Sequence, residues 1–300
     1  MIAFLPGSDM DKPKISVFCD VACELGEGPG YDPLTKTVWW FDIVTGRLFE
    51  KPLAGGDVQI QSLGQMASAL AVIDEGRQLI ATETGLFVRD RQTGHTTLRQ
   101  PIEADNPLTR SNDARVHPAG AFWIGTMGKK SEKGAGSIYW YRQGELRKLF
   151  SDISISNSIS FSPEGRIAYF ADTGKNIIWR VDTDPETGLP TGEPALFYQH
   201  KEKGGVDGSV VDGDGNLWNA CWGRSSIDVY APSGKRIRSI AMPVLQPSCP
   251  AFVSEDSGNL IVTTAYHHMT EAVHQSDPDA GKTFLIELAG KGRFDPPVRL

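Results

Sequence analysis

The chain has 300 residues, a formal net charge of −7, 40% hydrophobic residues and 32 glycines. An acidic chain without a basic stripe cannot neutralise phosphates, which argues against nucleic acid as a partner. It contains no run of about 18 apolar residues, which argues against a membrane-spanning helix.

The N-terminal segment, residues 1–13, has no basic stretch followed by an apolar stretch, as a secretory signal would. We therefore expect it to be a loose extension, and we expect the protein to be cytoplasmic. The four cysteines form no C-x-x-C pair. A zinc site or a disulfide at Cys19 and Cys23 is one alternative, but free buried thiols are the expectation for a reducing compartment.

A turn rich in Pro, Asp or Gly, followed by a short apolar strand, occurs six times along the chain. The copies are residues 31–40, 74–80, 117–123, 162–169, 212–218 and 255–261. The turn glycines of the last five, Gly76, Gly120, Gly165, Gly215 and Gly258, are 44, 45, 50 and 43 residues apart. Short strands with a period of about 45 residues are typical of a β-propeller with one four-stranded blade per repeat. The sequence therefore predicts an all-β, six-bladed β-propeller that forms a single domain over residues 1–300.

The two ends of such a ring have to meet. Residues 15–18 and 283–288 both have strand-like sequences, and we expect the first segment to complete the last blade and remove an exposed edge. Two insertions, 128–136 and 266–281, follow the strand after the repeated turn, so they should lie on one face of the disc. Long loops on one face of a rigid scaffold are where binding sites usually occur.

One position in each repeat, eight residues before the turn glycine, precedes the innermost strand. The residues there are Ser68, Asn112, Asn157, Asp207 and Pro250, and Glu27 is the matching residue of the first repeat. Innermost strands line the central channel, so these side chains should form a ring around one opening. Four of the six carry oxygen ligands, which suit a divalent cation such as Ca²⁺, Mg²⁺ or Mn²⁺. Taken singly, each could instead serve only as a turn residue.

Arg110 lies two residues before a ring position and could offer donors to substrate oxygens. The alternative is a surface arginine paired with Asp113 or Glu103. His267 and His268 lie in the sixth-repeat insertion. Neighbouring residues of an extended loop point in opposite directions, so we expect at most one of them to face the channel.

Several of these segments resemble the SMP-30/gluconolactonase/regucalcin-like family, most closely its bacterial sugar lactonases. The matching segments are Leu-Gly-Glu-Gly-Pro at 25–29, Arg-x-Asn-Asp at 110–113, Gly-Thr-Met at 125–127, Ser-Asn at 156–157 and Asp-Gly-Ser at 207–209. They occur in the family's order from about residue 20 to the C-terminus. The resemblance implies a six-bladed propeller with one divalent metal ion in its channel, which could be Ca, Zn, Mn, Mg or Fe.

Carried over by motif, the resemblance implies that Glu27, Asn157 and Asp207 are metal ligands. It implies that Arg110 and Asn112 contact the substrate and that Asp207 is also the general base. Some members of the family have an acidic pair shortly after Gly-Thr-Met, and one of its residues contacts the sugar. In this chain Lys130 occupies the acidic position unless Glu132 replaces it, and a lysine there favours an anionic substrate or a different sugar.

The sequence thus predicts an enzyme that hydrolyses a sugar (aldono-) lactone, its small-molecule partner, with a divalent metal ion as cofactor. Two alternatives use the same ring of residues. One is a hydrolase of organophosphates or other esters, in which Asn112 would be a fourth metal ligand. The other is a non-catalytic protein that binds Ca²⁺ for structure.

Overall fold

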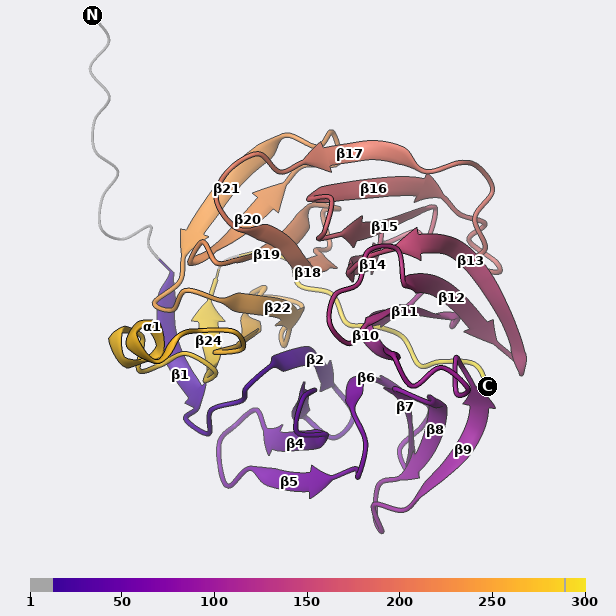
Figure 1. Cartoon of the computed structure of the whole chain (residues 1–300), viewed down its shortest axis with the longest axis horizontal. Coiled ribbons are helices and arrows are strands. Elements are labelled where there is room, and N and C mark those ends of the chain that lie inside the picture. The colour runs from indigo at the N-terminus through magenta and orange to yellow at the C-terminus, as the bar shows by residue number, and fades with distance from the viewer. Residues whose placement is uncertain (1–12, 289) are drawn as a thin grey trace, which may run out of the picture.

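Six four-stranded antiparallel sheets, here called blades, surround a common centre (Figure 1). The computed structural model describes residues 13–288 and 290–300. The arrangement is a six-bladed β-propeller, which confirms the predicted fold class. The extension expected at residues 1–13 lies, apart from Pro13, outside the described residues.

Each of the first five blades is built from four consecutive strands, and the first strand of each is the innermost (Figure 1). Blade 1 contains β2 (Gly26–Asp32), β3 (Thr37–Asp42), β4 (Arg47–Pro52) and β5 (Gln59–Ser62), and blade 2 contains β6 (Ala67–Val72), β7 (Arg77–Thr82), β8 (Gly85–Asp90) and β9 (Thr96–Pro101). Blade 3 contains β10 (Thr109–Val116), β11 (Phe122–Gly128), β12 (Gly136–Arg142) and β13 (Glu145–Ile153), and blade 4 contains β14 (Ser156–Phe161), β15 (Ile167–Asp172), β16 (Ile177–Asp182) and β17 (Ala195–Gln199). Blade 5 contains β18 (Gly205–Val211), β19 (Leu217–Trp222), β20 (Ser226–Tyr230) and β21 (Arg236–Ala241).

Blade 6 joins the two ends of the described chain. From the centre outward it contains β22 (Pro247–Phe252), β23 (Leu260–Thr264), β24 (Thr283–Glu287) and β1 (Lys14–Cys19). β1 pairs antiparallel with β24, with Ile15 opposite Ile286. The predicted closure of the ring is therefore confirmed, and β24 has no free edge where another chain could pair.

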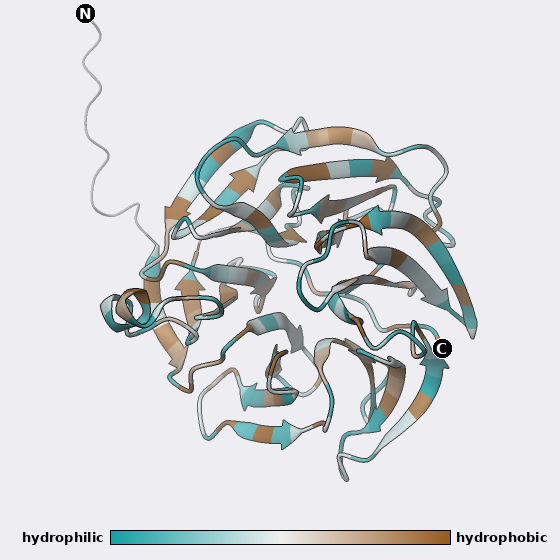
Figure 2. Ribbon diagram, viewed as in Figure 1, coloured by the Kyte–Doolittle hydropathy of each residue, from teal (hydrophilic) through white to brown (hydrophobic). Residues whose placement is uncertain are grey.

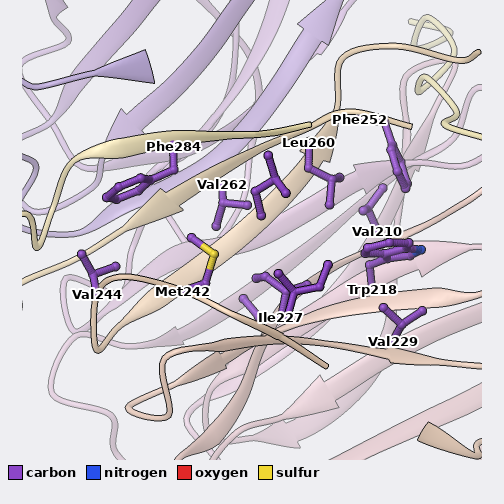
Figure 3. Packing of buried hydrophobic residues seen from close by; sticks show 13 residues of the cluster. Val210, Trp218, Ile227, Val229, Met242, Val244, Phe252, Leu260, Val262 and Phe284 are labelled. Carbon is purple, nitrogen blue, oxygen red and sulfur yellow. The ribbon is translucent and has the colours of Figure 1, made fainter. Parts of the chain in front are cut away.

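The hydrophobic core is divided into six clusters, and each cluster fills the space between two neighbouring blades. Figure 3 shows the cluster between blades 5 and 6, where Trp218 and Val229 face Phe252 and Val262. Apolar residues occur along the strands around the ring (Figure 2). Successive residues of a strand point to opposite faces, so Leu79 packs in the cluster shared with blade 3 and Ile80 in the cluster shared with blade 1. The innermost strand β14 is buried along its whole length, whereas the outermost strand β9 is largely exposed.

All four cysteines are free and buried, as the sequence predicts for a protein of a reducing compartment. The insertion at 266–281 contains a one-and-a-half-turn helix, α1 (Glu271–Ser276), whose N-cap residue Thr270 accepts a hydrogen bond from the backbone of Val273. Within the described part of the chain, no helix has the length and apolar character needed to cross a membrane.

The C-terminal tail, residues 290–300, forms no strand but lies across the innermost ends of several blades (Figure 1). Its backbone bonds to residues of blades 2, 3 and 5 and to the turn of blade 6, and the ring of Phe294 packs on Tyr31 of blade 1. These contacts fall at the C-terminal ends of the innermost strands. The tail thus covers one end of the central channel, which the sequence pattern did not predict.

A partly buried ion pair anchors the tail to β10. Nη1 of Arg115 donates to Oδ2 of Asp295 over 2.9 Å, and Arg115 is 5% exposed. The neighbouring carboxylate of Asp295 holds the pKa of Arg115 above its usual value, against the effect of burial. The tail therefore supplies the counter-charge of a guanidinium that lies inside the channel.

We expect Asp295→Asn to lower the free energy of unfolding by about 1–3 kcal/mol, because it leaves the buried charge of Arg115 without its partner. The loss should fall below that of a fully buried pair, since the Asp295 side chain is 31% exposed. Urea unfolding at neutral pH measures it. Asp214→Asn, which removes the exposed pair with Lys291, is the control and should cost less than about 0.5 kcal/mol. Equal losses for the two variants would contradict a special contribution of the Arg115–Asp295 pair to stability.

Candidate functional site

A cavity of about 160 Å³ opens at the end of the channel opposite to the tail. Its wall includes Glu27, Arg110, Asn112, Asn157 and Asp207. These five residues, the metal ligands and substrate contacts predicted from the sequence, come from blades 1, 3, 4 and 5 and are brought together here. The cavity is smaller than the pockets of about 300–1,000 Å³ that hold drug-sized ligands, and its size suits a single small ring.

A β-bulge at the same place in each innermost strand presents these side chains. In blades 1, 3, 4 and 5, two successive pairs of the ladder are three residues apart on the innermost strand but only two apart on the second strand. The innermost strand therefore carries one extra residue at each bulge. The bulges begin at Glu27, Ser111, Asn157 and Val206. A bulge bends the strand and redirects side chains that regular alternation would point elsewhere. The bulged segments thus carry Glu27, Asn112, Asn157 and Asp207 into the cavity wall.

The two remaining ring positions do not line the cavity. In blades 2 and 6 the bulge is shorter, with two residue steps against one, beginning at Ala67 and Pro247. Ser68 is fully buried and its hydroxyl donates to Ser111, while Pro250 pairs with Val262 in the ladder. Four of the six predicted ring residues therefore line the cavity. Ser68 lies at the shorter bulge of blade 2. Pro250 is not the equivalent residue of blade 6, because the turn there is two residues longer, with eight residues from Phe252 to its partner Leu260 against six from Val211 to Leu217 in blade 5.

Lys130 and Glu132, the two alternatives predicted for the remaining substrate contact, are exposed and are not part of the cavity wall. The carboxylate of Glu132 folds back and accepts a hydrogen bond from the backbone N–H of Lys130 over 3.0 Å. Lys129 and Ser131 line the cavity instead, and Lys129 forms an ion pair with Glu83. The shift arises because Lys129 directly follows β11, where the chain leaves the sheet beside the site.

Both histidines of the sixth-blade insertion border the cavity, so the prediction that at most one faces it was wrong. His268 has a φ of 60°, which breaks the alternation of an extended chain and brings its ring to 3.7 Å from that of His267. Nδ1 of His267 lies 3.0 Å from Oε1 of Glu24. Burial lowers the pKa of His267 below its usual value, despite the neighbouring carboxylate.

Arg110 is buried, at 8% exposure, and not a surface residue. Its Nη1 donates to Oδ1 of Asn112 over 2.6 Å and to the backbone oxygen of Ser111 over 2.9 Å. Among the described residues it forms no salt bridge with Asp113 or Glu103, the partners considered as the alternative. Burial lowers its pKa to about 10, although Glu27 and Asp207 lie near enough to oppose the shift.

The carboxyl groups of Glu27 and Asp207 are buried close to one another. Burial raises the pKa of each above its ordinary value, and the repulsion from other carboxylates adds to the rise. Asp113, behind the wall, repels both, and burial raises its own pKa to about 6. The buried guanidinium of Arg110 only partly offsets this repulsion.

The donor set fits one hard divalent cation. Glu27 and Asp207 offer carboxylate oxygens, Asn157 offers an amide oxygen, and such ligands suit Ca²⁺, Mg²⁺ or Mn²⁺. In the part of the chain that the structure describes, no three His, Cys, Asp or Glu side chains converge. Any cation here would thus depend on the amide as its third protein ligand, and its charge would favour the ionised carboxylates.

Sequence reasoning missed Thr173 and Trp222, which also line the cavity. Thr173 directly follows β15 and Trp222 ends β19, so each lies where the second strand of a blade reaches the site. The repeat could have predicted these two residues. The second strand of each blade runs antiparallel to the innermost strand, so it ends at the same edge of the sheet at which the innermost strand begins.

Known proteins and a family model are similar to this chain over most of its length. A model described as the SMP-30/Gluconolactonase/LRE-like region matches residues 25–266. The chain is 49% identical over 282 residues to a protein of Rhizobium meliloti named "Putative sugar lactone lactonase". The matched region covers 94% of this chain and 96% of that protein. It is 31% identical over 284 residues to L-arabinolactonase of Azospirillum brasilense, with 93% of each covered. A crystal structure from Agrobacterium tumefaciens described as a calcium-binding protein, regucalcin, superposes with a TM-score of 0.94 at 46% identity, covering 97% of this chain and 99% of that one.

We expect Glu27→Gln and Asp207→Asn each to stabilise the metal-free protein at pH 8 by roughly 1–2 kcal/mol, since one pKa unit corresponds to about 1.4 kcal/mol. A raised pKa in the folded state means that folding disfavours the ionised form. The penalty therefore grows as the pH rises above the ordinary pKa of the group, and the gain from the amide should shrink at pH 5. Thermal unfolding with chelator at both pH values measures this.

The exposed Glu132 provides the control, and Glu132→Gln should leave stability unchanged at both pH values. A loss of stability at pH 8 in both site variants would contradict the repulsion between the two carboxyl groups.

Proposed function

The chain belongs to the SMP-30/gluconolactonase/LRE-like family, which contains sugar lactone lactonases, and from that premise we propose that it is a divalent-metal-dependent hydrolase of a sugar (aldono-) lactone. One observation of the structure carries the proposal. Two buried carboxylates whose pKa values are raised, an amide oxygen and a buried arginine border one small cavity. Groups perturbed in this way cluster at functional sites.

Glu27, Asn157 and Asp207 would hold the metal ion. When bound, such an ion supplies Lewis-acid chemistry, which polarises a carbonyl and stabilises the negative charge that develops on its oxygen. In the proposal, side chains of the pocket transfer the proton and orient the substrate.

Asp207 accepts the proton of the attacking water in this scheme, because a carboxylate within hydrogen-bond reach of water can act as a general base. The bond between the carbonyl carbon and the ring oxygen then breaks, the ring oxygen takes up a proton, and the product is the open hydroxy acid.

Arg110 and Asn112 orient the substrate. The guanidinium has donors beyond those used for Asn112 and Ser111, and it can offer them to lactone or hydroxyl oxygens. Lys129, and not Lys130, is the lysine that borders the cavity and could contact the sugar. Its partner Glu83 offsets much of its charge, so a neutral sugar is compatible with the wall.

The test is hydrolysis of a panel of aldonolactones, other esters and phosphotriesters, followed by pH-stat at neutral pH, with elemental analysis of the purified protein. We expect turnover that chelator abolishes and that a divalent ion restores. Asp207→Ala should lower kcat by at least about 100-fold, since it removes both the proposed base and a proposed ligand. Asp214→Ala, on the surface, is the control and should retain full activity.

Rates unchanged by both chelator and Asp207→Ala would refute the proposal. A calcium-binding role without catalysis is the second candidate, supported by the description of the Agrobacterium tumefaciens structure. It predicts that removal of Ca²⁺ lowers the melting temperature while no lactone, ester or phosphotriester in the panel is hydrolysed.

A further inference from the structure

A chain of four hydrogen bonds runs along the wall of the cavity from blade 3 to blade 5. Arg110 Nη1 donates to Asn112 Oδ1 over 2.6 Å, and Asn112 Nδ2 donates to Asn157 Oδ1 over 3.1 Å. Asn157 Nδ2 then donates to Thr173 Oγ1 over 2.9 Å, and Thr173 Oγ1 donates to the backbone oxygen of Val206 over 2.7 Å. The chain thus links the proposed substrate contacts to a proposed metal ligand.

The two ends of the chain determine the direction of every bond in it. An arginine side chain can only donate, and a backbone carbonyl can only accept. Each asparagine in between must therefore turn its oxygen toward Arg110 and its NH₂ group toward Val206. Turning the Asn157 amide over would place its NH₂ against the NH₂ of Asn112, two donors face to face.

Thr173 carries the last part of this constraint. Because its hydroxyl hydrogen goes to the carbonyl of Val206, only lone pairs are left for Asn157, so the hydroxyl can accept from the Asn157 NH₂ group. The Asn157 oxygen accepts one bond from Asn112 and keeps a second lone pair. That lone pair is what a metal ion would need.

We propose that Thr173 is a positioning residue that holds the amide oxygen of Asn157 in the orientation needed to bind a divalent cation beside Glu27 and Asp207. The inference rests on the proposed metal site. It assigns Thr173 no contact with the reacting atoms, but it makes the affinity for the cation depend on a hydroxyl group in the neighbouring strand connection. Residues that orient metal ligands typically contribute about 10–100-fold to affinity.

The binding site is also tied to blade 5 by this contact. Val206 directly precedes Asp207, so the hydroxyl of Thr173 joins the amide of one proposed ligand to the backbone next to another. Loss of the hydroxyl would leave the Val206 carbonyl and the Asn157 NH₂ group without these partners, and the amide would be held from one side only, by Asn112.

The experiment is calorimetric titration of the chelator-treated protein with Mn²⁺ and, separately, with Ca²⁺, in wild type, Thr173→Val and Thr173→Ser. Valine has nearly the shape of threonine but no hydroxyl, and serine keeps the hydroxyl. We expect Thr173→Val to weaken binding of the ion that the wild type binds more tightly by about 10-fold or more. Thr173→Ser should stay within about threefold of the wild type.

Thr183→Val is the matched control for stability. Thr183 also donates its hydroxyl to a backbone carbonyl, that of Gly165, and is buried in blade 4, but it does not border the cavity. This variant should lose stability comparably while its affinity for the ion stays at the wild-type value. Melting temperatures of all variants verify that the titrated protein is folded.

The outcomes separate the two proposals. Wild-type affinity in Thr173→Val, or an equal loss in Thr173→Ser and Thr173→Val, overturns the role of Thr173 and leaves the metal-dependent function standing. If the wild type binds neither ion, and no other divalent ion restores lactone hydrolysis, the metal site itself is refuted and the inference falls with it.

Discussion

Closure of the ring is the constraint on which the rest of the structure depends. No blade buries its apolar faces alone, because each of the six core clusters is shared between two blades. The pairing of β1 with β24 completes blade 6, and the cluster that contains Trp40 and Ile261 then fills the gap between blades 6 and 1. Only in the closed ring do innermost strands far apart in the chain converge on one axis. The cavity, which draws its residues from blades 1, 3, 4 and 5, exists for that reason.

The innermost strands bring several charged side chains together in the channel, and ion pairing neutralises only part of that charge. Near one end, Glu27 and Asp207 repel each other and Asp113 adds to the repulsion. Toward the other end Arg115 is buried, and the tail supplies Asp295 as its partner. Burying like charges costs free energy, and buried charges of this kind cluster at sites that bind a ligand or carry out a reaction. The excess of carboxylate beside the cavity is the physical reason for proposing a cation there, and the hydrogen-bonded amides indicate how the proposed third ligand would be oriented.

The repeat predicted the fold, because a period of about 45 residues leaves few other architectures, and the strand-like sequences at the two ends predicted the closing strand. The repeat also selected Asn112, Asn157 and Asp207 by one shared offset, with Glu27 as the matching polar residue of the first repeat. The same offset failed at Ser68, where the bulge is of the shorter kind, and at Pro250, where the turn of blade 6 is two residues longer than that of blade 5. Bulge type depends on how two paired strands fit together, which a single repeat copy does not show. Lys130 and His268 were misplaced for a related reason, because local backbone angles in loops decide which neighbour faces the cavity.

By itself, the sequence determined the blade count, the polar residues available at the channel and the family to which they point, because these follow from periodicity and motif. The tertiary structure decided which of those residues share a cavity, which lysine borders it, and in which direction the amides of Asn112 and Asn157 are turned. It alone placed the C-terminal tail across the channel and Asp295 on Arg115. The tail has no periodic pattern, and its contacts reach five blades, of which blades 1, 2, 3 and 5 lie far from it in the sequence. Contacts of that kind depend on positions that exist only after the ring has closed.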